Sequence, residues 1–304
     1  MSISAFVRRL VISTIFFCIA SRAVLLGDNV NLHYVLPDRK AGLFSIFASV
    51  VGLLEFHDRS PDAGITVDFA NSGFYYTPEK GPNWWNYYFE PIAFGSKENA
   101  QIVDINLNQS CSLSFYALTL PVARTNQIIT KYIKVRPEIQ AQVQDFIRAN
   151  FQNSFVIGVH YRGTDKPCEA PQVPYASVAR EIDLLMQKRV GKKKIFVATD
   201  EQAFLDFMRA RYGNLVVYQK MQRSQDGKAL HYVHEQGVYN AGPNAYQGGL
   251  EAVIDCLLLS HCNALFKTAS NLSACSVMFN PKIEVYQLST NDWEKWDKKD
   301  LYNH

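Results

Sequence analysis

The second half of the chain alternates strand-like and helix-like segments, and this alternation restricts the fold more than any other feature. Strand patterns occupy residues 155–160, 193–200, 214–219, 263–268 and 282–288. Helical patterns lie between them, at residues 174–190, 201–213, 245–262 and 270–281. Strands joined by crossover helices form a parallel sheet that is covered on both faces, so we expect an α/β fold.

The first half shows a less regular alternation of strand and helix patterns. A strand pattern at 31–36 is followed by a helical pattern at 41–57 and another strand at 64–69. With 304 residues, the chain is long enough for two domains, which we place at residues 24–150 and 151–304. Hydrophobic residues make up 48% and charged residues 19%, as in globular proteins, and a net charge of +3 gives no reason to expect a nucleic-acid partner.

The N-terminus has the layout of a secretory signal peptide. Two arginines precede an apolar stretch of about eleven residues, and small residues stand at Ser21 and Ala23. That stretch is shorter than the ~20 residues of a membrane span. We expect residues 1–23 to be a signal peptide or a short anchor, with an ordinary buried element as the remaining alternative. The protein would then be exported, to the secretory lumen or a bacterial periplasm or envelope, with any membrane tether at this end only.

Polar residues gather where three of the predicted strands end. In an open parallel sheet, ligands bind outside the carboxyl ends of the strands. The first group, in "HYRGTDKPCEA", contains His160, Arg162, Asp165, Lys166 and Glu169. The second contains Asp200, and the third, in "KTASNLS", contains Thr268, Ser270 and Asn271.

Each of these residues also has an ordinary structural interpretation. Asp200 and Ser270 precede predicted helices, where aspartate and serine are common caps. His160 alone is more often a core histidine than a catalyst. Asp255 lies on an apolar helix, so it must be paired or hydrogen-bonded, either as a structural contact or as a ligand contact.

Taken together, the groups favour a diphosphate site. A helix N-terminus offers free backbone N–H groups to an anion, and an arginine such as Arg162 adds a charged clamp. The sequence has neither a Walker loop nor a GxGxxG motif, and it has no Asp-x-Asp pair or zinc-type cysteine spacing. We therefore expect cationic side chains and backbone to neutralise the diphosphate, with no metal and no cofactor.

Three segments, in this order, resemble the inverting fucosyltransferases, including the α-1,6-fucosyltransferases, the bacterial nodulation enzymes and the protein O-fucosyltransferases. They are "HYRGTDK", "FVATDEQAFLDFMRARYG" and "LEAVIDCLLLSHCNALFKTASNLSACSVMFNP". The resemblance covers roughly residues 155–282, and "AGLFSIF" looks like the opening turn of the same enzymes. It implies a GT-B architecture, in which two Rossmann-like domains with parallel sheets face a cleft.

The resemblance also implies roles for individual residues. It gives a nucleotide-sugar donor, GDP-fucose, and a glycan or glycoprotein acceptor. Arg162 would clamp the β-phosphate, and Asp165 and Lys166 would order its loop. Asp200 and Asp255 would contact the guanosine or brace its pocket. Ser270 would bind the diphosphate, and His160, Thr268 and Asn271 would also contact the donor. Glu169 would be the general base.

The sequence departs from the α-1,6 enzymes at two positions. Gly163 stands where they have a second arginine, and Glu201 stands where they have a second aspartate. The first departure leaves a catalytically degenerate sugar-binding relative as an alternative. Another alternative is a metal-dependent phosphohydrolase, in which His160 and the aspartates would gather around a metal.

An aromatic loop at residues 71–92 allows two interpretations. Its rings, Trp84, Trp85, Tyr87 and Tyr88, could stack on an acceptor sugar or anchor the loop to the core. The sequence does not decide between them.

Overall fold

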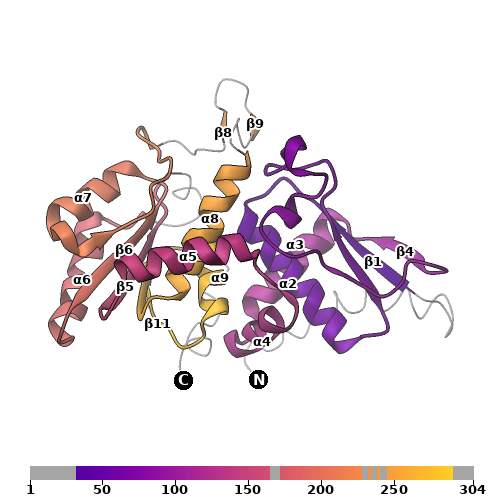
Figure 1. Cartoon of the computed structure of the whole chain (residues 1–304), viewed down its shortest axis with the longest axis horizontal. Coiled ribbons are helices and arrows are strands. Elements are labelled where there is room, and N and C mark those ends of the chain that lie inside the picture. The colour runs from indigo at the N-terminus through magenta and orange to yellow at the C-terminus, as the bar shows by residue number, and fades with distance from the viewer. Residues whose placement is uncertain (1–31, 165–171, 228–231, 234–237, 240–244, 290–304) are drawn as a thin grey trace. The chain divides into compact units, whose positions relative to one another are not determined.

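The computed structural model describes residues 32–164, 172–227, 232–233, 238–239 and 245–289. By its internal contacts the chain forms two compact units, Met1–Arg136 and Pro137–His304, which we call the first and second units. Each unit has its own sheet, and Figure 1 labels the elements. The expected signal peptide at residues 1–23 lies outside the described residues. No helix in the described part of the chain combines the length and the hydropathy of a membrane span.

The first unit is built on a four-stranded sheet of order β3-β2-β1-β4, in which only β3 runs antiparallel. Its strands are β1 (Leu32–Pro37), β2 (Gly64–Asp68), β3 (Ala93–Phe94) and β4 (Gln101–Asp104). Its helices are α2 (Leu43–Arg59), α3 (Leu107–Thr119) and α4 (Val122–Tyr132), with short 3-10 turns η1 (Pro78–Lys80) and η2 (Trp84–Tyr87).

Helix α2 is the centre of the first unit. It is buried over most of its length, because apolar residues fill several of its faces rather than a single stripe. Its Gly52 lets α3 approach closely: a Cβ there would be 2.4 Å from the backbone oxygen of Leu113. Any side chain at position 52 would therefore push the two helices apart.

The aromatic loop of the first unit belongs to this core. Trp84, Trp85 and Tyr88 are fully buried, and Tyr87 is nearly so. Trp85 stacks on Phe47 of α2 at 6.0 Å between ring centroids. The anchoring interpretation is the correct one, because rings without exposed faces have no surface to offer a sugar.

The second unit is built on a five-stranded, all-parallel sheet of order β11-β10-β5-β6-β7. Its strands are β5 (Phe155–Tyr161), β6 (Lys193–Thr199), β7 (Val216–Val217), β10 (Ala264–Lys267) and β11 (Glu284–Gln287). Its helices are α5 (Pro137–Asn150), α6 (Tyr175–Lys188), α7 (Gln202–Tyr212), α8 (Ala245–Ser260) and α9 (Asn271–Phe279). A 3-10 turn, η4 (Gly213–Leu215), precedes β7, and a small ladder joins β8 (Tyr232–Val233) to β9 (Val238–Tyr239).

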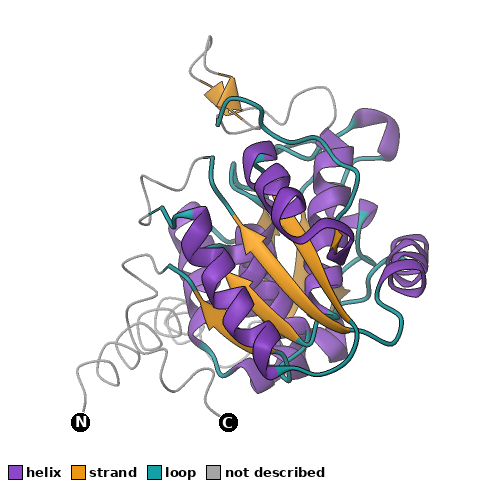
Figure 2. Cartoon of the chain, turned by 90° about the vertical axis from the view of Figure 1, so that its left-hand side faces the viewer, coloured by secondary structure: helices purple, strands orange, loops and turns teal. Residues whose placement is uncertain are grey.

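The side chains of β5 alternate between the two faces of the sheet. Both faces are covered. Ile157, Val159 and Tyr161 pack in one cluster with residues of α6 and α7. Gly158 faces the other side, where a Cβ would be 3.0 Å from Cys262 Sγ, at the end of α8. Figure 2 turns this unit toward the viewer and shows its strands between helices on both sides.

The predicted parallel α/β fold is confirmed, and the predicted elements of the second half lie close to the observed ones. Helices α3 and α4 were not predicted, and β7 is shorter than the expected strand. The division of the chain falls between Arg136 and Pro137, so α5 goes with the second unit. The roles that we expected for the two halves stay predictions.

A buried carboxylate ties the helices of the first unit together. The Glu55 side chain of α2 is fully buried and forms ion pairs of 2.6 Å with Arg59 and with Arg124 of α4. Arg124 also reaches Asp58 at 2.6 Å. Hydrogen bonds from Lys131, Tyr132 and Arg124 hold the pKa of Asp58 below its usual range.

We predict that Arg124→Met lowers the free energy of unfolding by about 3 kcal/mol, because it leaves the buried Glu55 with a single partner. Lys131→Met is the matched control, since Lys131 is exposed and pairs with Asp58 rather than with the buried Glu55. Urea denaturation of the two variants measures the difference. A Lys131 effect as large as that of Arg124 would contradict the assignment of the stabilising pair.

Candidate functional site

The neighbouring strands β5 and β10 of the second unit end at a topological switch point. From β5 the chain passes through α6 to β6 on one side, whereas β10 and β11 add to the other side of β5. Crevices at such points are the usual ligand sites of open α/β sheets. The predicted residue His160 lies near the end of β5, and Arg162 directly follows that strand. Thr268, Ser270 and Asn271 follow β10.

Backbone and side-chain hydrogen bonds join the ends of β5 and β10. His160 is buried near the end of β5, and its carbonyl accepts from the N–H of Thr268 at 3.1 Å. The N–H of Arg162 in turn donates to Thr268 Oγ1 at 3.0 Å. The structure therefore brings Arg162 directly beside the turn that leads into α9, as the sequence predicted.

The Asp200 carboxylate shapes the loop after β5. One oxygen accepts from the N–H of Gly163 at 3.2 Å, and the other accepts from the Thr164 hydroxyl at 2.7 Å. Arg162 Nε lies 3.7 Å from that second oxygen. Asp200 sits at the end of β6, next to β5, so the sheet itself holds the carboxylate under the loop that carries Arg162. This contact makes Asp200 a brace of the candidate site.

The start of α9 forms the other wall of the site. Ser270 is the residue that precedes the helix, and its side chain makes no capping hydrogen bond. Ser273 instead donates back to the carbonyl of Ser270 at 3.2 Å. Ser270 and Thr268 are buried, and Asn271 is the first residue of the helix. The first-turn N–H groups carry the positive end of the helix dipole, which suits an anion.

Asp255 lies in a separate contact group on α8. Its side chain is 4% exposed, and its Oδ1 accepts from Gln219 Nε2 at 2.6 Å. Burial raises the pKa of Asp255 to about 7, against the opposing effects of Gln219 and of the nearby charge on Arg223. Its direct partners are thus structural, which fits the bracing part of our expectation.

The segment after β7 connects the two aspartates, and sequence reasoning missed it. Gln219 contacts Asp255, and the buried Arg223 donates to the carbonyl of Gln219 at 2.8 Å. Ser224 N–H then donates to the backbone oxygen of Asp200 at 2.8 Å. The one signal in the sequence was an arginine, Arg223, in the loop between a strand and an apolar helix. The sequence does not show that this arginine is buried.

Three of the predicted site residues, Asp165, Lys166 and Glu169, lie outside the described residues. Their roles in ordering the loop and as the general base stay predictions. Within the described ranges, no group of three or more His, Cys, Asp or Glu side chains is arranged to hold a metal ion.

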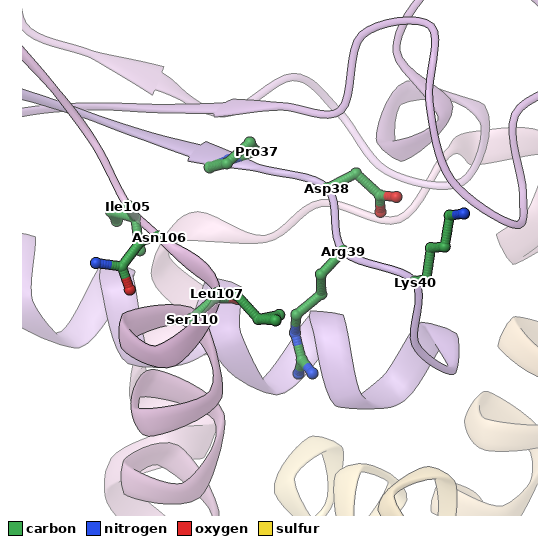
Figure 3. Close-up of a pocket in the computed structure, with 8 residues that line it drawn as sticks. All are labelled: Pro37, Asp38, Arg39, Lys40, Ile105, Asn106, Leu107 and Ser110. Atoms are coloured by element: carbon green, nitrogen blue, oxygen red, sulfur yellow. The ribbon is translucent and has the colours of Figure 1, made fainter.

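The first unit has a pocket of about 380 Å³ at its own switch point, between the ends of β1 and β4 (Figure 3). Its lining includes Asp38, Arg39, Lys40, Asn106 and Ser110. Arg39 runs toward α2, where it donates to Ser45 Oγ at 2.8 Å, whereas Asp38 and Lys40 point elsewhere. The pocket thus has acidic and basic side chains, but these point in different directions and do not converge on one point.

Asp38 differs from an ordinary surface carboxylate. Burial raises its pKa to about 6, although Trp84 Nε1 donates to its Oδ1 at 3.1 Å and lowers it. The Trp84 bond joins this side of the pocket to the aromatic core of the first unit. The carboxyl is therefore fixed in place and titrates near neutral pH.

We predict that Thr268→Val lowers the free energy of unfolding by about 1–3 kcal/mol, because the N–H of Arg162 loses its acceptor. Thr268→Ser keeps the hydroxyl and removes only a methyl group, so its effect should stay below about 1 kcal/mol. Urea denaturation compares the two. Equal losses would mean that the methyl group matters rather than the hydrogen bond.

We predict a pH dependence of stability from Asp255. Its pKa is about 7 in the folded protein and about 3.8 when unfolded, so the folded state keeps a proton that the unfolded state releases. The stability from this group is present below about pH 4 and is lost as the pH rises toward 7. Asp255→Asn, whose amide oxygen still accepts from Gln219, should therefore gain stability relative to the wild type across that interval. Denaturation at several pH values measures the difference, and a constant difference would contradict the raised pKa.

Solved structures with a similar fold include fucosyltransferases. The fucosyltransferase NodZ from Bradyrhizobium shares 15% identity at a TM-score of 0.57, over 86% of this chain and 100% of that chain. A NodZ α-1,6-fucosyltransferase soaked with GDP-fucose shares 17% identity at a TM-score of 0.56, over 83% of this chain and 94% of the other. A mutant of Arabidopsis thaliana FUT1 in complex with GDP shares 11% identity at a TM-score of 0.51, over 94% and 79%. At these identities the likeness shows the fold.

The family comparison is more specific. No curated protein sequence gives a significant match. The family model of nodulation protein Z (NodZ), however, matches residues 121–293, which is more than half of the chain and includes every described residue of the candidate site. This protein belongs to the NodZ family.

Proposed function

We propose that the chain is an inverting fucosyltransferase, which transfers fucose from GDP-fucose to a hydroxyl group of a glycan or a protein. Membership of the NodZ family supports the activity. Two NodZ structures of similar fold, one soaked with GDP-fucose and one co-crystallised with GDP, support the donor. In this chain, the observation that carries the proposal is the hydrogen bond that joins the Arg162 backbone to Thr268, at the switch point of the second sheet.

The site supplies what the leaving group requires. When the bond between fucose and the diphosphate breaks, negative charge builds on the β-phosphate oxygen. The Arg162 backbone is bonded to Thr268 in the turn into α9. The Arg162 guanidinium would stabilise that charge together with the first N–H groups of α9. The sheet positions the backbone of both groups before the reaction begins, which reduces the reorganisation needed in the transition state.

The acceptor hydroxyl requires a base. Inversion means that the hydroxyl attacks the sugar carbon from the face opposite the diphosphate, while a carboxylate removes its proton. We assign this role to Glu169, on the basis of the resemblance. Asp200 is a poorer candidate, because its two oxygens already accept from Gly163 and Thr164. The N-terminal unit would bind the acceptor.

We also propose that the reaction needs no divalent metal. The proposal rests on charge: Arg162 and the N-terminus of α9 can neutralise a diphosphate without one. The sequence has no Asp-x-Asp pair to bridge a metal to the donor. A metal-dependent phosphohydrolase is not favoured, since Asp200 contacts the loop after β5 whereas Asp255 contacts Gln219.

The test is a donor screen with the full chain. We predict that GDP and GDP-fucose raise the thermal midpoint, whereas UDP does not, because a bound ligand stabilises only the folded state. Arg162→Ala should abolish the GDP shift, and Arg162→Lys should restore it only in part, since lysine cannot form a bidentate clamp. Arg180→Ala, on the exposed face of α6, is the matched control and should keep the full shift.

Transfer assays decide between the alternatives. Release of GDP in the presence of a glycan acceptor, unchanged by EDTA, would support a metal-independent transferase. GDP binding without transfer to any of a panel of glycans and peptides would instead favour a degenerate binding relative. Phosphate release that EDTA abolishes would overturn the proposal in favour of the hydrolase.

A further inference from the structure

A side chain at position 163 would fit only if the Glu201 carboxylate and the Tyr161 ring moved. A Cβ atom at this position would be 2.0 Å from Glu201 Oε2 and 2.9 Å from Tyr161 Cε1. Carbon atoms in contact are normally about 3.5–4.0 Å from their neighbours. Gly163 is not among the glycines with positive φ, so its backbone does not require glycine. The neighbouring carboxylate is what excludes a side chain.

Glu201 is held against Gly163 by contacts on two sides. Its N–H donates to Thr199 Oγ1 at 3.2 Å, and it stands immediately before helix α7. Burial raises the pKa of the Glu201 carboxylate, and the nearby hydroxyl of Tyr175, the first residue of α6, opposes that shift. The Tyr175 ring packs in turn on the ring of Tyr161, with 5.4 Å between centroids. The Glu201 side chain is thus partly buried beside Gly163 rather than exposed on the open surface.

The contact between Glu201 and position 163 matters for the site because of where Gly163 lies. Gly163 follows Arg162 directly, and its N–H binds Asp200. A side chain at position 163 would leave the same loop as the Arg162 guanidinium. Glu201 instead fills that volume with an acidic group, next to the acidic Asp200. In the described part of the loop after β5, Arg162 thus has two carboxylates near its backbone, those of Asp200 and Glu201.

We propose that Glu201 determines how strongly this site holds a diphosphate. Its carboxylate keeps any second cationic side chain out of position 163, and its charge weakens the hold of Arg162 on the anion. The consequence is faster release of the nucleoside diphosphate after transfer. The inference rests on the proposed function, because the anion concerned is the diphosphate of the donor.

Charge removal is the first test. Glu201→Gln keeps the size of the side chain and an acceptor for Tyr175. We expect the Kd for GDP, measured by calorimetry, to fall about fivefold, with the Kd for guanosine unchanged, because only GDP carries the diphosphate. Glu181→Gln, on α6 beside Arg180, is the matched control and should change neither Kd. The gain should shrink at high salt, which screens charges that are not in contact.

Steric coupling is the second test. Gly163→Ala should lower the thermal midpoint by itself, because the new Cβ meets the Glu201 carboxylate. Adding Glu201→Asp withdraws that carboxylate, so the double variant should melt above Gly163→Ala. Recovery should be incomplete, since the Tyr161 ring must still move slightly. Additive losses in the double variant would overturn the coupling.

The two proposals fail in different ways. If the wild-type protein binds neither GDP nor GDP-fucose, the proposed function fails and this inference fails with it. If the wild type binds GDP but Glu201→Gln changes the affinities for GDP and guanosine equally, or changes neither, the inference fails and the function stands. A larger gain for GDP than for guanosine supports both.

Discussion

The carboxylate of Asp200 is the contact on which the candidate site depends. It reaches from the end of β6 to the neighbouring strand, where it accepts from the backbone of Gly163 and from the Thr164 hydroxyl and approaches Arg162. The parallel register of β5 and β6 fixes this geometry, because it aligns Tyr161 with Thr199, one residue before each polar loop begins. Sheet pairing thus brings Asp200 close to the loop that carries Arg162.

Much of this could be predicted from the sequence, because parallel sheets obey simple rules. Buried strands with Val, Ile and Phe runs, separated by helices, led directly to the sheet of the second unit and to the strand ends that gather polar residues. The first unit was harder to predict. Helix α3 mixes serines with its apolar residues, and it packs closely against α2 at Gly52. Only its capping box, Asn106 with Gln109, was readable locally.

The pairing of side chains within the site could not be predicted, since it depends on contacts between distant segments. Nothing local links Asp255 to Gln219 and Arg223, or Ser224 to Asp200. The two departures from the motif of the α-1,6 enzymes, Gly163 and Glu201, looked independent in the sequence. In the structure they are neighbours, because a Cβ at position 163 would be 2.0 Å from Glu201 Oε2.

Contacts from β11, the edge strand of the second unit's sheet, and from the residues just after it hold the turn that leads into α9. The buried Lys267, at the end of β10, donates to Gln287 of β11 at 2.9 Å, and the N–H of Ala269 donates to Ser289 Oγ at 3.2 Å. The turn that leads into α9 is therefore tethered by residues about twenty positions further along the chain. Shortened forms of this protein that stop before Ser289 would lose an anchor of the anion-facing turn, even with every residue that touches the ligand still present.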